Sequence, residues 1–152
     1  MKQLTRMIAL IGSLAITGDT LAGEQQGALA TAMQLLDAFN RHDPAAMAAL
    51  VDHDFQLYYV SSEGVSELAT SGPDQLENQM VEYFRTRPTV RSEVEGSIDG
   101  PRFAAFRERA ISRHGEVERS QSSMAVYEVV DGKILRVWYY PAEAPRSTPV
   151  GE

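Results

Sequence analysis

The sequence predicts an α+β fold in which a curved antiparallel sheet wraps around three helices of the N-terminal half and encloses a cone-shaped pocket. Helical periodicity of apolar residues is confined to the first half of the chain, and strand-like segments separated by Gly-containing turns fill the second half. The stretch 124–140 consists of two β-rich segments joined by Asp131-Gly132, a pair typical of a two-residue hairpin turn. Helices followed by a run of antiparallel strands predict an α+β domain.

Composition limits the classes of function. A chain of 152 residues is long enough for one domain with a substantial core. Its formal charge of −7 argues against a nucleic-acid partner, because phosphate binding needs clustered Lys and Arg. With no Cys the chain has no disulfide, no thiolate chemistry and no cysteine metal site.

Residues 1–22 have the pattern of an export signal. Lys2 and Arg6 form a basic start, 7–16 is a short apolar run, and 20–22 offers small residues for cleavage. The apolar run is too short to span a bilayer, which takes about twenty residues. We therefore expect a periplasmic or secreted protein; the alternative is an ordinary first helix of a cytoplasmic protein.

Three helices are expected next. Gln26–Arg41 has an apolar stripe at helical spacing, and Ala45–Val51 is a short helix with Asp43 as its N-cap and Pro44 at its first position. The third helix begins at Gly72-Pro73-Asp74 and ends before Pro88. Its predicted buried stripe consists of Leu76, Met80, Tyr83 and Phe84.

One strand precedes the third helix. In Phe55–Val60, alternation places Phe55, Leu57 and Tyr59 on one face. The polar segment Ser61–Ser71 is expected to be a loop or a weak edge strand, and Asp52-His53-Asp54 a turn.

The second half is expected to form an antiparallel meander of four strands. These strands are Thr89–Ile98, Arg102–His114, Val117–Val130 and Lys133–Tyr140. The domain then spans 23–141, and 142–152, with two prolines and little apolar surface, is expected to be a loose tail.

The order of these elements resembles the nuclear-transport-factor-2-like superfamily, within it the SnoaL-like (polyketide-cyclase-like) and ketosteroid-isomerase-like domains. The resemblance rests on Arg41-His42-Asp43-Pro44 at the end of the first helix, Asp54-Phe55 at a strand start and Asp131-Gly132-Lys133-Ile134 in the last hairpin, and it covers Leu29 to Pro141. It implies a cystatin-like α+β roll and a homodimer. It does not select an activity, because such domains include isomerases, dehydratases, cyclases, epoxide hydrolases and non-catalytic binders.

The catalytic set of the ketosteroid isomerases is not matched. Those enzymes use an aspartate base and an oxyanion hole formed by a tyrosine and a protonated aspartic acid. The corresponding positions here are Tyr59 for the base, Leu35 for the tyrosine, and Met124 or Ala125 for the acid. Steroid isomerisation by that mechanism is therefore not expected.

Arg107 and Arg109 are candidate binding residues. The resemblance points their strand face into the cone, where a guanidinium would clamp a ligand carboxylate with two hydrogen bonds. In the alternative arrangement both arginines face water and the other strand face is inward, namely Ala104, Phe106, Ala110 and Ser112. The epoxide hydrolases of the superfamily pair an Arg with two Asp residues, whereas the strands here offer only Glu108 and Glu118.

Tyr59 and Tyr139 align with inward positions and could donate hydroxyl protons to a substrate; the alternative is core packing. Trp138 and Tyr140 have the opposite parity and are expected outside the sheet, at a dimer interface.

Metal and cofactor sites are not expected. His42, His53 and His114 lie in predicted turns without ligand spacing, and solvated turn histidines are the simpler interpretation. The sequence has no phosphate-cradling glycine loop and no nucleophile elbow around its serines.

The sequence thus predicts an exported small-molecule-binding domain for a small hydrophobic or weakly acidic ligand. Alternatives are an acid–base lyase, isomerase or cyclase, with Tyr59 moving protons and Arg109 stabilising charge, and a non-catalytic dimerisation or scaffold module. The predicted ligand-binding residues are Tyr59, Met80, Phe84, Arg107, Arg109, Met124, Val137 and Tyr139.

Overall fold

The computed structural model describes residues 27–149. Its helices are α1 (Ala28–Asn40), α2 (Pro44–Leu50) and α3 (Pro73–Thr86). Its strands are β1 (Val51–Val60), β2 (Ser66–Ser71), β3 (Arg91–Asp99), β4 (Phe103–His114), β5 (Val117–Val130), β6 (Lys133–Tyr139) and β7 (Arg146–Pro149). The predicted signal peptide, 1–22, lies outside the described residues.

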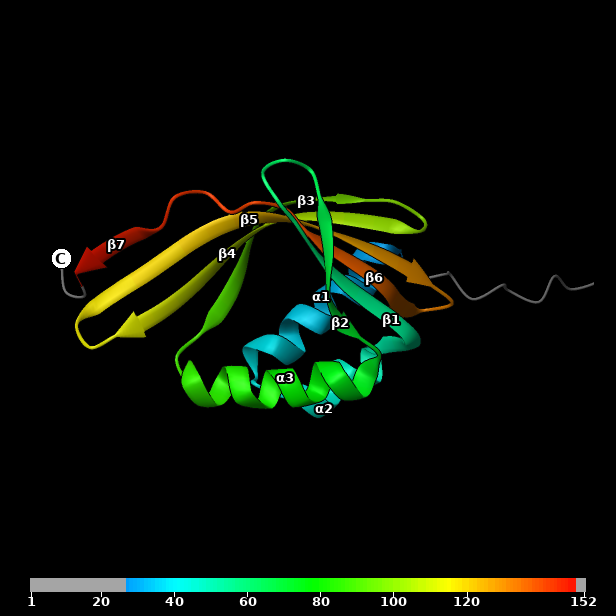
Figure 1. Cartoon of the computed structure of the whole chain (residues 1–152), viewed down its shortest axis with the longest axis horizontal. Helices are drawn as coiled ribbons and strands as arrows, with labels where there is room; N and C mark the ends of the chain where they lie inside the picture. The colour runs from blue at the N-terminus through cyan, green and yellow to red at the C-terminus, as the bar shows by residue number, and fades with distance from the viewer. Residues whose placement is uncertain (1–26, 150–152) are drawn as a thin grey trace, which may run out of the picture.

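The strands form one curved sheet that arches over the helices (Figure 1). The strand order is β2-β1-β6-β5-β4-β3, and β7 pairs with the far end of β5. β1 and β6 pair in parallel, so the sheet is mixed rather than wholly antiparallel as predicted. With three helices on the inner face, the predicted α+β roll is confirmed.

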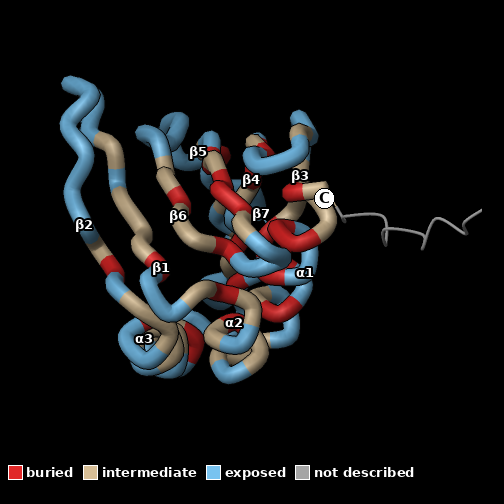
Figure 2. The backbone as a smooth tube through the Cα atoms, turned by 90° about the vertical axis from the view of Figure 1, so that its right-hand side faces the viewer, coloured by how far each residue is buried: buried red, intermediate tan, exposed pale blue. Residues whose placement is uncertain are grey.

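Apolar alternation explains where the core lies. Ala104 and Phe106 of β4, Tyr127 of β5 and Val137 of β6 are each about 1% exposed and point toward the helices. From the helices, Leu35 and Leu76 complete the same cluster. Figure 2 shows the buried segments between the sheet and the helices, while the β1–β2 hairpin projects away from them.

Two segments differ from the prediction. β1 begins at Val51, so Asp52-His53-Asp54 belongs to a strand and not to a turn. Ser66–Ser71, by contrast, forms β2 at the sheet edge and confirms the edge-strand alternative. Within the expected loose tail, Arg146–Pro149 pairs with β5, because β5 extends beyond β6 and leaves its edge open there.

No helix within residues 27–149 is long and apolar enough to cross a bilayer.

The short helix α2 depends on its N-cap. The Asp43 carboxylate accepts a hydrogen bond from the Ala46 backbone N–H at 2.9 Å, and Pro44 occupies the first helical position. We expect Asp43→Ala to lower the free energy of unfolding by about 1 kcal/mol, measured by urea denaturation. Asp43→Asn is the matched control, since asparagine caps equally well; an equal loss in both variants would contradict the capping role.

Candidate active site

A cavity of about 220 Å³ lies between the inner face of the sheet and the helices. Most of its wall is apolar and comes from all three helices and from β1, β4 and β6. These apolar residues are Leu35, Leu36, Phe39, Met47, Phe55, Leu57, Leu76, Met80, Ala110 and Val137. The polar side chains come mainly from the sheet: Tyr59, Ser92, Glu108, Ser123, Tyr127 and Tyr139, with Tyr83 added by α3. The cavity is therefore apolar with a polar patch on β4, β5 and β6.

Among the described residues that line the cavity, Glu108 is the only one with a carboxyl group. It is 4% exposed, because alternation along β4 puts it on the same inward face as Ala104 and Phe106. Burial raises the pKa of the Glu108 carboxyl, and the hydroxyls of Tyr139 and Tyr127 oppose this rise by hydrogen bonding. A carboxyl group with a raised pKa in a cavity is suited to proton transfer.

Two tyrosines complete this polar patch. The Tyr127 hydroxyl donates to Glu108 Oε1 at 3.3 Å and lies 3.1 Å from the Tyr139 hydroxyl. Burial raises the pKa of both phenols well above the usual 10.0, and the nearby Glu108 charge raises it further. Both hydroxyls therefore remain protonated and can donate hydrogen bonds, while Glu108 is the group that can give and take a proton.

Half of the predicted ligand-binding residues line this cavity, namely Tyr59, Met80, Val137 and Tyr139. Tyr59 is 58% exposed, so it lies at the mouth rather than in a proton-handling position inside. Phe84 does not line the cavity: it is buried behind it, stacked on His42 with ring centroids 4.4 Å apart. The lining residue from this turn of α3 is Tyr83.

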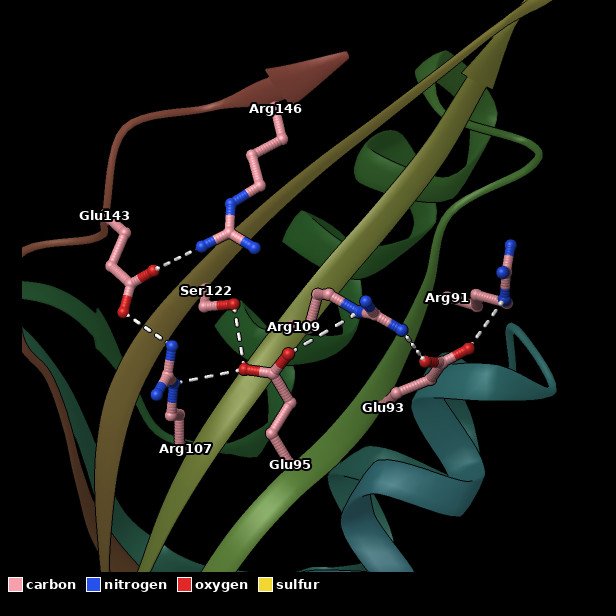
Figure 3. Close-up of polar contacts among 8 residues, drawn as sticks. All are labelled: Arg91, Glu93, Glu95, Arg107, Arg109, Ser122, Glu143 and Arg146. Atoms are coloured by element: carbon pink, nitrogen blue, oxygen red, sulfur yellow. Dashed lines mark hydrogen bonds and ion pairs between the residues drawn. The ribbon is translucent and has the colours of Figure 1, made fainter. Parts of the chain in front are cut away.

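The prediction that Arg107 and Arg109 point into the cone is wrong. Glu108 and Ala110 line the cavity, so the residues that alternate with them lie on the outer face of the sheet. There Arg109 Nη2 donates to Glu93 Oε2 at 2.5 Å, and Arg107 lies between Glu95 and Glu143 at 3.1 and 2.7 Å (Figure 3). Both guanidinium groups find their counter-charges within the chain.

Met124 also lies on the outer face, directly opposite Arg107 in the β4–β5 ladder. It contributes to a hollow of about 380 Å³ with Ile98, Arg107, Pro141 and Glu143. This hollow is larger than the inner cavity but more open to solvent. Its one arginine, Arg107, already forms ion pairs with Glu95 and Glu143. The inner cavity is therefore the better candidate for chemistry.

Of the three histidines, His42 departs from the expectation of a solvated turn residue, whereas His53 and His114 are exposed as expected but lie in strands. His42 donates from Nε2 to the Val90 carbonyl at 2.7 Å and is partly buried. His53 bridges Asp52 and Asp54 at 2.9 and 3.0 Å, and this trio is the one group among residues 27–149 close enough to hold an ion. Both imidazole nitrogens of His53 already contact carboxylates, so the polar groups of these three residues are paired with one another.

Sequence reasoning missed Glu108 because it chose the wrong face of β4. The signal that identifies the outer face is in the neighbouring strand, where Glu93 and Glu95 share one parity. The ladder sets Glu93 opposite Arg109 and places Arg107 within reach of Glu95, so the charges of both strands pair on one face. That pairing leaves Glu108 as the carboxyl group on the inner face of β4.

Comparison with known proteins agrees with this architecture. A family model described as a SnoaL-like domain matches residues 32–137. A comparison with curated proteins finds no match.

Solved structures with the same fold have low sequence identity to the chain. RV0760c from Mycobacterium tuberculosis has a TM-score of 0.67 at 14% identity, covering 80% of this chain and 96% of its own. The Delta 5-3-ketosteroid isomerase from Mycobacterium sp. has a TM-score of 0.61 at 16% identity, with 80% and 98% covered. A computationally designed 17-OHP binder has a TM-score of 0.60 at 15% identity, with 80% and 95% covered. By the family match over most of its length, the chain belongs to the family of SnoaL-like domains.

Proposed function

We propose that the inner cavity binds a small, largely apolar molecule and that Glu108 exchanges a proton with it, as in an isomerase, lyase or cyclase. The observation that carries this proposal is a buried carboxyl, 4% exposed and hydrogen-bonded to Tyr127, in a cavity whose wall is mostly apolar. A cavity filled with side chains would favour a scaffold module, whereas a volume of about 220 Å³ supports a small-molecule site.

The chemistry follows from the positions of three side chains. The Glu108 carboxylate takes a proton from a carbon next to a carbonyl group of the ligand, and the C–H electron pair moves onto the carbonyl oxygen. The Tyr139 hydroxyl turns its proton from Tyr127, 3.1 Å away, to that oxygen, while Tyr127 continues to donate to Glu108. Protonated Glu108 then returns the proton to another carbon, which gives an isomer. If a group leaves from the next carbon instead, the product is that of a lyase.

The raised pKa of Glu108 supports this role. A base whose pKa lies closer to the working pH removes a carbon-bound proton more effectively than an ordinary carboxylate. The arrangement also differs from the ketosteroid-isomerase set that the chain lacks, because the carboxyl comes from the middle of β4. Among the structures with this fold are an isomerase and a designed binder, so binding without turnover is the second candidate. The large apolar share of the cavity wall supports this second candidate, ligand binding without turnover.

Exchange of carbon-bound protons tests the proposal without knowledge of the natural substrate. 1-Tetralone, a neutral two-ring ketone, is incubated with the protein in D₂O, and loss of its α-proton signal is followed by NMR. Exchange that is faster with the wild-type chain than with Glu108→Gln supports acid–base chemistry. If 1-tetralone binds but the wild-type chain exchanges its α-protons no faster than Glu108→Gln does, the function is ligand binding without catalysis.

We propose that the ligand binds in the cavity and not on the outer face of the sheet. A substitution of Arg109, which lies on the outer face, distinguishes these two locations. We expect Arg109→Met to leave the affinity for 1-tetralone unchanged, measured by ligand-observed NMR titration, because the guanidinium bonds to Glu93 across the outer face. The Arg109–Glu93 ion pair is partly exposed and screened by solvent, so the free energy of unfolding should change by less than about 1 kcal/mol. A loss of affinity in Arg109→Met would contradict the assignment of faces.

We also propose that the chain forms a homodimer through the outer face of its sheet. An apolar row crosses the whole sheet in the pairing register, with aliphatic residues at both ends and aromatic rings between. Its members are Ile98, Ala105, Val126, Trp138, Tyr58 and Leu68. The neighbouring charges are paired within the chain, so two such faces do not repel each other.

Ile98→Asp is expected to weaken this dimer. Ile98 is 73% exposed, so the substitution leaves the core intact while placing an unpaired carboxylate in the proposed interface. Sedimentation velocity should show a shift toward monomer. Val81→Asp, at 54% exposure on α3, is the control on the opposite side of the molecule and should not shift it. A monomeric wild-type chain at all concentrations would rule the interface out.

Export is proposed from residues 1–22. Expression in a bacterium with an outer membrane, followed by fractionation and intact mass measurement, tests it: a periplasmic chain beginning at Gly23 is the expected product.

A further inference from the structure

We infer that the ligand of the inner cavity is a neutral carbonyl compound of one or two rings, and neither an organic acid nor a four-ring compound. This inference rests on the proposed function for the choice of cavity, and it adds the size and charge of the molecule that the cavity accepts.

The volume limits the size of the ligand. The cavity measures about 220 Å³. An apolar cavity of about 150 Å³ in another protein binds benzene, so the space here fits one ring with room for a second. Part of the wall cannot retreat easily, because Phe55 and Val137 line the cavity, are each 1% exposed and belong to the main core cluster.

The charges of the wall exclude an anion. None of the residues that line the cavity, all of them in the described part of the chain, is Lys, Arg or His. A carboxylate bound there would lose its hydration with no cation to replace it, and it would lie beside the buried carboxyl of Glu108. The ligand is therefore neutral, in contrast to the weakly acidic ligand that an inward Arg109 would have bound.

The polar patch selects a hydrogen-bond acceptor. The phenols of Tyr127 and Tyr139 lie 3.1 Å apart, and both belong to the cavity wall. Once one of them has donated to Glu108, the other can donate into the cavity, where a carbonyl oxygen is the simplest neutral acceptor.

Aromatic side chains favour a flat ring. The rings of Tyr59 and Tyr139 have centroids 6.2 Å apart, and Tyr59 presents a 58% exposed side chain at the mouth. Phe39 and Tyr83 form a second aromatic pair in the wall, 6.1 Å apart. A planar ligand packs against such rings by offset or edge contacts.

Met80 of α3 is the residue that limits the length of the ligand. It lines the cavity and is only partly buried, so its thioether chain is the part of the wall that a substitution can remove without opening the core. Its neighbour Val81 faces solvent at 54% exposure and provides a matched control on the same helix turn.

The experiment measures the affinities of four probes for the wild-type chain by ligand-observed NMR: acetophenone, 1-tetralone, benzoate and the four-ring enone testosterone. We expect both small ketones to bind and to compete with each other. Benzoate should bind at least about tenfold more weakly than acetophenone, and testosterone should not bind. Met80→Ala should gain testosterone binding, and Val81→Ala should behave as the wild type.

Three results would overturn the inference: benzoate binding as tightly as acetophenone, testosterone binding to the wild type as tightly as 1-tetralone, or no binding of any probe. The proposed function fails separately. If the ketones bind in the expected order but Glu108→Gln exchanges their α-protons as fast as the wild type, the size and charge limits hold and the acid–base role does not. If only testosterone is bound and exchanged, the acid–base role holds and the limits fail.

Discussion

Replacing Glu108 with glutamine is expected to slow α-proton exchange of a bound ketone by about 100- to 10,000-fold, the range over which a positioned general base contributes. The amide keeps the size of the side chain and can still accept the Tyr127 hydroxyl proton, which the carboxylate accepts at 3.3 Å, so the cavity keeps its shape. What is lost is the ability to take up a proton. NMR in D₂O measures the rate, and the affinity for the ketone should remain close to that of the wild type.

Glu116→Gln is the matched control, because Glu116 lies exposed in the β4–β5 turn and the substitution makes the same chemical change. It should leave the exchange rate unchanged. Equal rates for the wild type and Glu108→Gln would refute the catalytic assignment.

The raised pKa of Glu108 also predicts the direction of the pH dependence. Because the pKa is higher in the folded chain than in the unfolded one, the stabilising contribution of this group is complete below the unfolded pKa and is lost as pH rises through the folded pKa. As pH rises from the unfolded pKa through the folded pKa, the free energy of unfolding of Glu108→Gln should therefore increase relative to that of the wild type. The exchange rate of the wild type should rise over the same interval, since the carboxylate is the active form.

The largest expected effect on stability is that of Phe106→Ala. The Phe106 side chain is 1% exposed, and its ring centroid lies 5.1 Å from that of Tyr127, the tyrosine that bonds to Glu108. Removing the ring leaves a cavity that the surrounding core closes only partly, and the expected loss in the free energy of unfolding is about 3–5 kcal/mol. Urea denaturation followed by circular dichroism measures it.

Phe103→Ala is a control on the same strand with the same chemical change. Phe103 is 48% exposed and lies on the outer face, so its loss should cost less than about 1 kcal/mol. Similar losses for the two variants would show that the inward and outward faces of β4 are assigned wrongly, and with them the inward position of Glu108.

The fold was predictable because its signals are local. The cap at Asp43-Pro44 and the Asp131-Gly132 turn depend on residues near each other in the chain, and the structure has both. The parallel pairing of β1 with β6 is not local: it joins Leu57 to Val137, and no short pattern specifies it. Because the turn signals that can be read from the sequence all join antiparallel strands, the prediction was a wholly antiparallel sheet.

The site was predictable only in part, because its polar centre depends on which face of β4 is buried. Both faces of this strand mix apolar and charged residues, so alternation alone does not decide between Arg109 and Glu108. The decision comes from the pairing of Arg109 with Glu93, a contact between strands. Tyr139 was found because the family resemblance aligned it with an inward position, whereas Tyr127 was missed because its hydroxyl gains a role only from its two neighbours.

The position of β6 between β1 and β5 has a consequence for synthesis of the chain. β1 can pair with β2 once Ser71 has left the ribosome, but its second neighbour, β6, begins only at Lys133. The β1–β2 hairpin and the β3–β5 meander cannot join into one sheet until residues 133–139 are released. Such distant pairing favours folding in milliseconds to seconds rather than microseconds, and it makes the last hairpin the step that closes the domain.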